Sequence, residues 1–133
     1  MSVTGFVRAG RRQAEALMLD TCTIRPVTGN TTNPSTGVVT PAYGAAVYTG
    51  KCKIQNQRSF PSNPDAGEHQ WTVAPTFIHL PVAGTGTVDT GHILEITASA
   101  MDPANVGRKF RVKSGDRKSL QTALRLNVEE VVN

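Results

Sequence analysis

Two segments near the C-terminal end of the chain alternate apolar and polar side chains with a period of two. They cover residues 109–113 and 124–129, and every second residue in them is apolar. Successive side chains of a β-strand point to opposite faces, so this alternation predicts two half-buried antiparallel strands. The face turned to water would carry dense charge but no nucleophile, general base or metal-ligand set in recognisable order. We therefore expect a chain that binds partners and is not an enzyme.

Strand patterns recur over most of the chain. They cover residues 21–28, 48–55, 71–82 and 92–97, and the segments between them are rich in turn-forming residues. The 133 residues are enough for one domain with one core, and no strand–helix–strand alternation is present. The expected fold class is therefore mainly β, a small antiparallel β-barrel or sandwich of about six strands with an N-terminal α-helix and long loops.

The N-terminal segment has a different period. From residue 3 to residue 19, apolar side chains recur at steps of three and four, which predicts an amphipathic helix with Ser2 as its N-cap. Basic side chains fall largely on its other side, and they are Arg8, Arg11 and Arg12. Because Gly5 and Gly10 weaken a helix, this one is expected to need a packing partner, either its own barrel or a neighbouring subunit.

Helix and strands are expected to form one domain, with residues 1–20 as the helix and residues 21–133 as the barrel. Two long segments interrupt the strands. Residues 29–46 predict an extended hairpin with its tip at 33–37. Residues 56–70 form a polar loop, and a loop of this length in a compact domain is usually functional or disordered. If it is functional, its candidate contact residues are Arg58, Phe60, Asp65 and Glu68.

The net charge of +4 is modest, and apart from the helix the basic residues concentrate between Arg108 and Lys118. A basic face of this kind is solvated, or it meets an acidic partner or a phosphate backbone. The sequence contains no apolar run of the length that a signal peptide or a membrane span needs, so we expect a cytoplasmic site of assembly and no membrane. Cys22 and Cys52 are then expected to be small buried hydrophobes and not a disulfide.

Chemical motifs are sparse. Asp89, Thr90 and Gly91 match the active-site triplet of aspartic proteases, in which two such loops share one proton. His92 stands where that family carries a small residue, and the second signature is missing, so a turn explains the triplet better. The histidines and cysteines do not stand at ligand spacing, and no glycine-rich phosphate loop is complete. We expect no catalytic residue, metal or cofactor.

Five stretches follow the basic helix along the chain, and their order is the basis of a resemblance. They are residues 48–55, 70–73, 90–96, 102–112 and 122–131. This order resembles the head-to-tail joining proteins of long-tailed bacteriophages of actinobacteria, specifically the head-closure or stopper type. The resemblance covers nearly the whole chain, although each piece is a strand pattern and not a chemical motif. One departure is His92, where the resemblance leads us to expect an aspartate.

The resemblance implies a homo-oligomeric ring, commonly sixfold, in the neck of the virion. Portal and adaptor proteins would lie on its head side, and tail-terminator or tail-tube proteins on its tail side. Such rings retain packaged DNA, which they contact without sequence specificity, and present the surface to which the tail attaches. The helix arginines would then face the adaptor or a neighbouring subunit, and the 56–70 loop would close the channel or contact the tail. The candidates for contact with other subunits or with the channel's contents on the closing strands are Arg111, Lys113, Arg125 and Glu129.

Two alternatives remain from the sequence. An adaptor or tail-terminator protein would form a ring one layer away in the same neck. A small nucleic-acid-binding β-barrel would use basic side chains on its strands, and the candidates are Lys51, Lys53, Arg111, Lys113 and Arg117. Such a barrel is expected to expose aromatic side chains for base stacking, and the sequence offers few.

Overall fold

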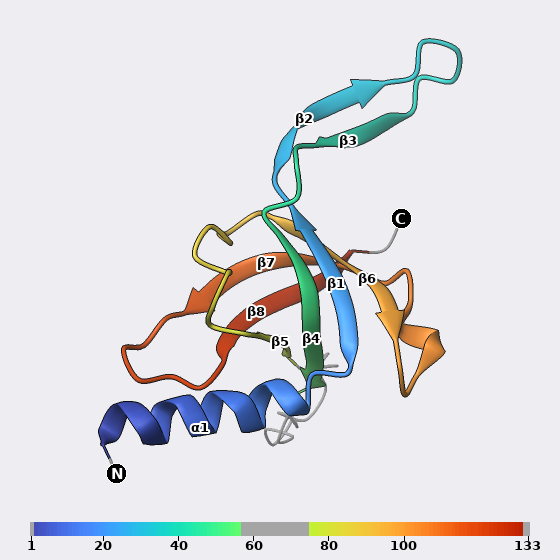
Figure 1. Cartoon of the computed structure of the whole chain (residues 1–133). Helices are drawn as coiled ribbons and strands as arrows, with labels where there is room; N and C mark the ends of the chain where they lie inside the picture. Colours follow the sequence, from blue (N-terminus) through green and yellow to red (C-terminus); the bar gives the residue numbers. More distant parts are fainter. Residues whose placement is uncertain (1, 57–74, 132–133) are drawn as a thin grey trace, which may run out of the picture.

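The computed structural model of the protein describes residues 2–56 and 75–131 (Figure 1). In chain order its elements are α1 (Val3–Ala16), β1 (Asp20–Arg25), β2 (Val27–Thr32), β3 (Val39–Tyr43), β4 (Tyr48–Asn56), β5 (Thr76–Leu80), β6 (Ile93–Ser99), the 3-10 helix η1 (Pro103–Asn105), β7 (Lys109–Asp116) and β8 (Leu124–Val131). Six of these strands close a barrel in the order β1-β4-β5-β8-β7-β6, whereas β2 and β3 form a separate two-stranded sheet. The predicted mainly β fold is confirmed, as a closed antiparallel barrel and not a sandwich.

The alternation in β7 and β8 arises because every second side chain faces the barrel interior. The buried residues of the two strands are Phe110, Val112, Leu124, Leu126 and Val128. Val112 pairs with Val128, but the register shifts before Ser114, which marks a β-bulge at Lys113. The bulge changes the phase of β7 and lets the strand continue to Asp116, beyond the end of the sequence pattern.

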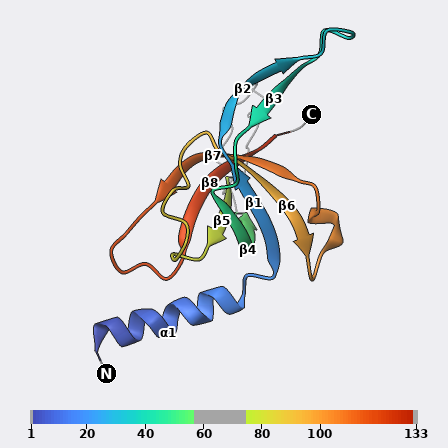
Figure 2. The ribbon, with the colours of Figure 1, turned by 45° about the horizontal axis from the view of Figure 1, so that its top comes forward.

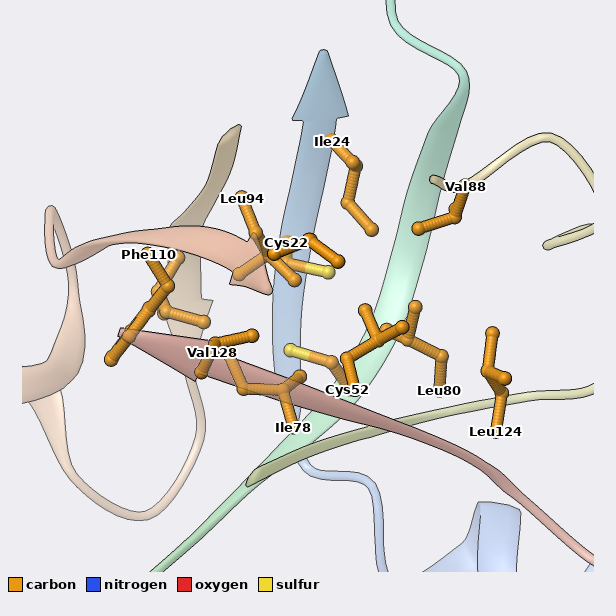
Figure 3. Close-up of a cluster of buried hydrophobic side chains, with 13 residues drawn as sticks. Cys22, Ile24, Cys52, Ile78, Leu80, Val88, Leu94, Phe110, Leu124 and Val128 are labelled. Atoms are coloured by element: carbon orange, nitrogen blue, oxygen red, sulfur yellow. The ribbon is translucent and has the colours of Figure 1, made fainter. Parts of the chain in front are cut away.

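The interior is filled by side chains from the strands and by Val88 of the loop before β6 (Figure 3). Cys22 of β1 and Cys52 of β4 are completely buried there and carry free thiols, as predicted. A hydrogen bond with Cys52 and burial both raise the pKa of the Cys22 thiol far above its usual range. Cys22 is therefore a neutral, packed side chain.

Several predicted boundaries were wrong. The strand expected at 21–28 is two strands, because Pro26 has no N–H and separates β1 in the barrel from β2 outside it. The helix ends at Ala16 and not at residue 19, and Met18 beyond its end is buried, with only 5% of its surface exposed. The strand expected at 71–82 is β5 alone within the described residues, because 71–74 lie outside them.

Two elements lie outside the barrel at its opposite ends. The hairpin β2–β3 projects from one end, and α1 runs along the other (Figures 1 and 2). The hairpin turn contains Gly37 with a φ of +70°, a conformation that glycine adopts without strain. At the base of the hairpin, the Gly44 N–H donates a hydrogen bond of 2.9 Å to the Pro26 carbonyl. The hairpin is thus a separate arm with a closed neck.

Candidate interaction surfaces

The Asp89-Thr90-Gly91 triplet forms a turn before β6. The Asp89 carboxylate accepts a hydrogen bond of 2.7 Å from the N–H of Thr90, and the His92 N–H donates to the Asp89 carbonyl at 3.3 Å. Gly91 has a φ of +87°, which explains the glycine without catalysis. The described residues hold no cluster of three histidine, cysteine or acidic side chains suited to a metal ion. Nor does any helix among them combine the length and apolar character needed to cross a bilayer.

The helix α1 rests on the connection between β7 and β8. A Cβ atom built on Gly10 would lie 2.7 Å from the Cγ2 methyl of Thr122, so the two backbones approach closely. Next to this contact, Arg11 Nε donates a hydrogen bond of 3.1 Å to the Gln121 carbonyl. Arg8 and Arg12 are exposed instead. The three helix arginines proposed as one interaction face are therefore divided, because Arg11 binds the barrel of its own chain.

Replacing Gly10 by alanine is expected to loosen α1 from the barrel, although alanine raises the intrinsic stability of a helix by about 0.5–1 kcal/mol. The added methyl would overlap Thr122, whose branched side chain has few rotamers with which to move away. Amide hydrogen exchange in α1 should become faster. The double variant Gly10→Ala/Thr122→Ala removes the overlapping methyl and should restore slow exchange. Wild-type exchange in the single variant would show that this contact does not hold the helix.

An apolar strip of α1 has no partner among the described residues. Val3, Phe6 and Leu17 are 64%, 62% and 62% exposed, and α1 has no buried residue at all. The start of the helix is fixed by its N-cap, because the Ser2 hydroxyl accepts a hydrogen bond of 3.1 Å from the Gly5 N–H. The helix therefore offers an apolar strip to the outside while its other edge contacts the barrel.

The β2–β3 arm is exposed along almost its whole length. Within its two strands only Ala42 is partly buried, and no charged residue occurs from position 26 to position 50. The strands pair only with each other, so each has one open edge. Pro41 of β3 lies opposite Asn30 of β2. A proline nitrogen fits a ladder only where it points away from the partner strand, so the open edge of β3 lacks a donor there, whereas no proline interrupts β2.

Charges on the closing strands are largely paired within the chain. Arg111 Nη1 lies 3.1 Å from Glu129 Oε1, and Arg108 forms two hydrogen bonds of 3.0 Å to Glu130. The hydrogen bonds to Arg108 lower the pKa of the Glu130 carboxyl. Lys113 at the bulge is exposed. Arg111 is thus less available to a partner than the sequence indicates, and Lys113 is the accessible member of the predicted pair.

Other predicted contact residues are placed differently. Arg117 donates hydrogen bonds of 2.6 and 3.3 Å to the carbonyls of Thr85 and Val88, so its role is structural. The loop candidates lie outside the described residues, and they are Arg58, Phe60, Asp65 and Glu68. Sequence reasoning named Arg125 among the contact candidates, but it missed the outward-facing residues Phe77 and His79, which become neighbours of Arg125 only through the strand register. No motif in the sequence marks them.

Comparison with known proteins gives one match. No curated protein and no solved structure matches the chain. The profile of a family described as "Family of unknown function (DUF6093)" matches residues 10–129. The match extends from the middle of α1 to β8 and so includes the barrel and the arm. The chain therefore belongs to this family of unknown function, DUF6093.

Proposed function

We propose that this protein is a structural component of the neck of a long-tailed bacteriophage, a head-to-tail connector of the stopper or head-closure type. It would form a homo-oligomeric ring, commonly sixfold, that helps to retain packaged DNA and provides the surface to which the tail attaches. Its neighbours would be portal or adaptor proteins on the head side and tail-terminator or tail-tube proteins on the tail side. The order of sequence segments supports this proposal, and so does the arrangement of the two elements outside the barrel.

The arm carries most of the structural argument. A two-stranded sheet without further packing is marginally stable in water, and this one exposes Val27, Val38, Val39 and Tyr43. Because the segment has no charge, neither repulsion nor the removal of water from ions opposes its burial against a partner. The edge of β2 also lacks the charge or proline with which edge strands usually resist pairing. These properties suit an arm that packs on another protein.

The helix supplies a second surface at the other end of the barrel. Its exposed apolar strip and the exposed Arg8 and Arg12 suit a contact with a partner that has both apolar and acidic groups. Within residues 2–56 and 75–131 the barrel is closed and has no strand edge to offer, so contacts of this part of the chain through strand pairing depend on the arm. A rigid body with docking elements at opposite ends fits a protein that joins two layers. An adaptor or tail terminator would use the same arrangement one layer away.

Excising the arm tests this function in the phage that encodes the chain. The hydrogen bonds from Gly44 to Pro26 and from Val47 to Ile24 close the neck, so residues 27–43 can be replaced by an Asn-Gly turn without disturbing β1 and β4. The excised protein should fold as a barrel by circular dichroism. Particles carrying it should lose DNA from filled heads or fail to join tails in electron micrographs. Normal infectious particles, or absence of the wild-type protein from virions, would contradict the proposal.

A single substitution separates pairing by the β2 edge from the mere presence of the arm. Asn30 lies opposite Pro41, so its N–H points outward like the proline nitrogen. Asn30→Pro should therefore keep the ladder inside the arm and remove one donor from its open edge. Asn30→Ala keeps that donor and serves as the control. Fewer particles with tails are expected for Asn30→Pro than for Asn30→Ala, and equal yields would exclude pairing at this position.

A further inference from the structure

Four polar side chains form a row across the outer face of the barrel. In the strand register, Lys53 of β4 lies opposite His79 of β5, His79 opposite Arg125 of β8, and Arg125 opposite Asp116 of β7. All four point outward, because the residues that alternate with them in β5 and β8 are buried in the core. Neighbouring strands are about 4.8 Å apart, so Lys53 and Arg125 stand on either side of His79 at a separation of about 10 Å.

The row is short of negative charge. The Asp116 carboxylate lies 3.5 Å from Lys118 Nζ, and Arg125 forms no ion pair or hydrogen bond with the side chains of residues 2–56 and 75–131. Burial lowers the pKa of His79, and the charges of Arg125 and Lys53 lower it further. Lys53 and Arg125 are two positive charges separated by one strand, and charges of the same sign at this distance repel each other weakly. An anion placed between Lys53 and Arg125 would relieve this repulsion.

The surface beside the row is hollowed. Hollows of about 330, 240 and 300 Å³ border Arg125: the first reaches Ala14 of α1, the second contains Gln55 and Asn56, and the third contains Ser114 and Asn127. The partly exposed Phe77 side chain borders the second and third. In register Phe77 lies between Gln55 and Asn127, so an aromatic ring and two amides form a second row parallel to the basic one. Such rings and amides contact bases and sugars of nucleic acids.

We propose that the outer face of β4, β5 and β8 binds the phosphodiester backbone of DNA. Lys53 and Arg125 contact phosphates, the neutral His79 between them supplies a hydrogen-bonding nitrogen, and Phe77 packs against an adjoining sugar or base. The ring proposed above would bring DNA to this face, and in that respect the inference rests on it. DNA binding by this face can be measured on the isolated chain, so this proposal and the connector role can be disproved independently of each other. Phe77 and the amides favour nucleic acid as the partner, because positively charged side chains alone would be sufficient to bind an acidic protein.

Fluorescence anisotropy of the whole chain with labelled DNA tests this face. Duplex and single-stranded oligonucleotides of equal length are titrated between 50 and 200 mM salt. Neutralising two phosphate contacts in Lys53→Gln/Arg125→Gln should reduce the slope of log affinity against log salt by about 2 for duplex DNA and weaken binding about tenfold at the lower salt. The matched control Arg25→Gln/Lys109→Gln removes two positive charges elsewhere on the barrel, on β1 and β7, and it should bind as the wild type does.

A third variant assigns the role of the aromatic ring. Phe77→Leu keeps the charges and should weaken single-stranded DNA about fivefold or more, because base stacking is lost, with a smaller effect on the duplex. Equal losses in the two double variants would show that only net charge matters and would overturn the site. So would wild-type protein that binds a polyglutamate peptide but not DNA. Loss of tails on excising the arm would still support the connector in either case.

Discussion

Replacing Phe110 by alanine is expected to lower the free energy of unfolding by about 3–5 kcal/mol. Phe110 has the largest of the fully buried side chains and lies in the barrel interior, where the alanine would leave a cavity. A small domain has a total stability of only about 5–15 kcal/mol, so this loss is a large part of it. The urea concentration at the midpoint of unfolding, followed by circular dichroism, measures the change.

Phe77 provides a matched control for this substitution on the same barrel. Its ring lies on the outer face and is partly exposed, so the same change to alanine removes fewer contacts and leaves no enclosed cavity. Phe77→Ala should cost less than about half of what Phe110→Ala costs. Similar losses for both variants would mean that the interior is not packed around Phe110 as described.

Replacing Arg117 by methionine is expected to cost about 1–3 kcal/mol of stability. The guanidinium donates hydrogen bonds of 2.6 and 3.3 Å to the carbonyls of Thr85 and Val88 in the loop before β6. Thr85 is fully buried, and its hydroxyl donates to the carbonyls of Pro81 and Val82, so it is not free to serve another acceptor. Without Arg117, the Thr85 carbonyl loses a charged donor in a place that water reaches poorly.

The control for Arg117 is Arg111, which carries the same charge. Arg111 lies within β7, and Arg117 directly follows the end of that strand. Arg111 forms only an exposed ion pair with Glu129, and such pairs contribute about 0–1 kcal/mol. Arg111→Met should therefore shift the urea midpoint by less than Arg117→Met does. Equal shifts would show that Arg117 contributes only its charge. A larger shift for Arg117→Met would confirm that a residue suited by sequence to nucleic-acid contact stabilises the fold.

The position of Phe77 changes how the nucleic-acid interpretation of this barrel should be weighed. From the sequence, the low aromatic content argues against base stacking. The strand pattern alone does not show which of the few aromatic rings lie on the outer face of the barrel. The register places Phe77 on the outer face of β5, between two amides and beside Arg125. A DNA-contacting face and a connector role are compatible in one protein, since the first uses the side of the barrel and the second its two ends.

The sequence by itself determined the local features of this protein. Alternation predicted the buried residues of β7 and β8, the spacing of apolar residues predicted α1 with Ser2 as its cap, and the composition predicted that both thiols are buried. These features depend on side chains that are close in the chain, so a single segment contains the necessary information. For the same reason, the ends of elements were less accurate: Pro26 divides a pattern that otherwise continues.

Only the tertiary structure decided which distant residues become neighbours. Closure of the barrel left the arm with the only open strand edges of the described residues, and the register joined Lys53, His79 and Arg125 in one row. The tertiary structure also separated two arginines of similar sequence context: Arg111 forms an exposed ion pair, whereas Arg117 forms a structural hydrogen bond. Register and closure depend on the packing of all six strands together, including the bulge at Lys113, and no single segment specifies them.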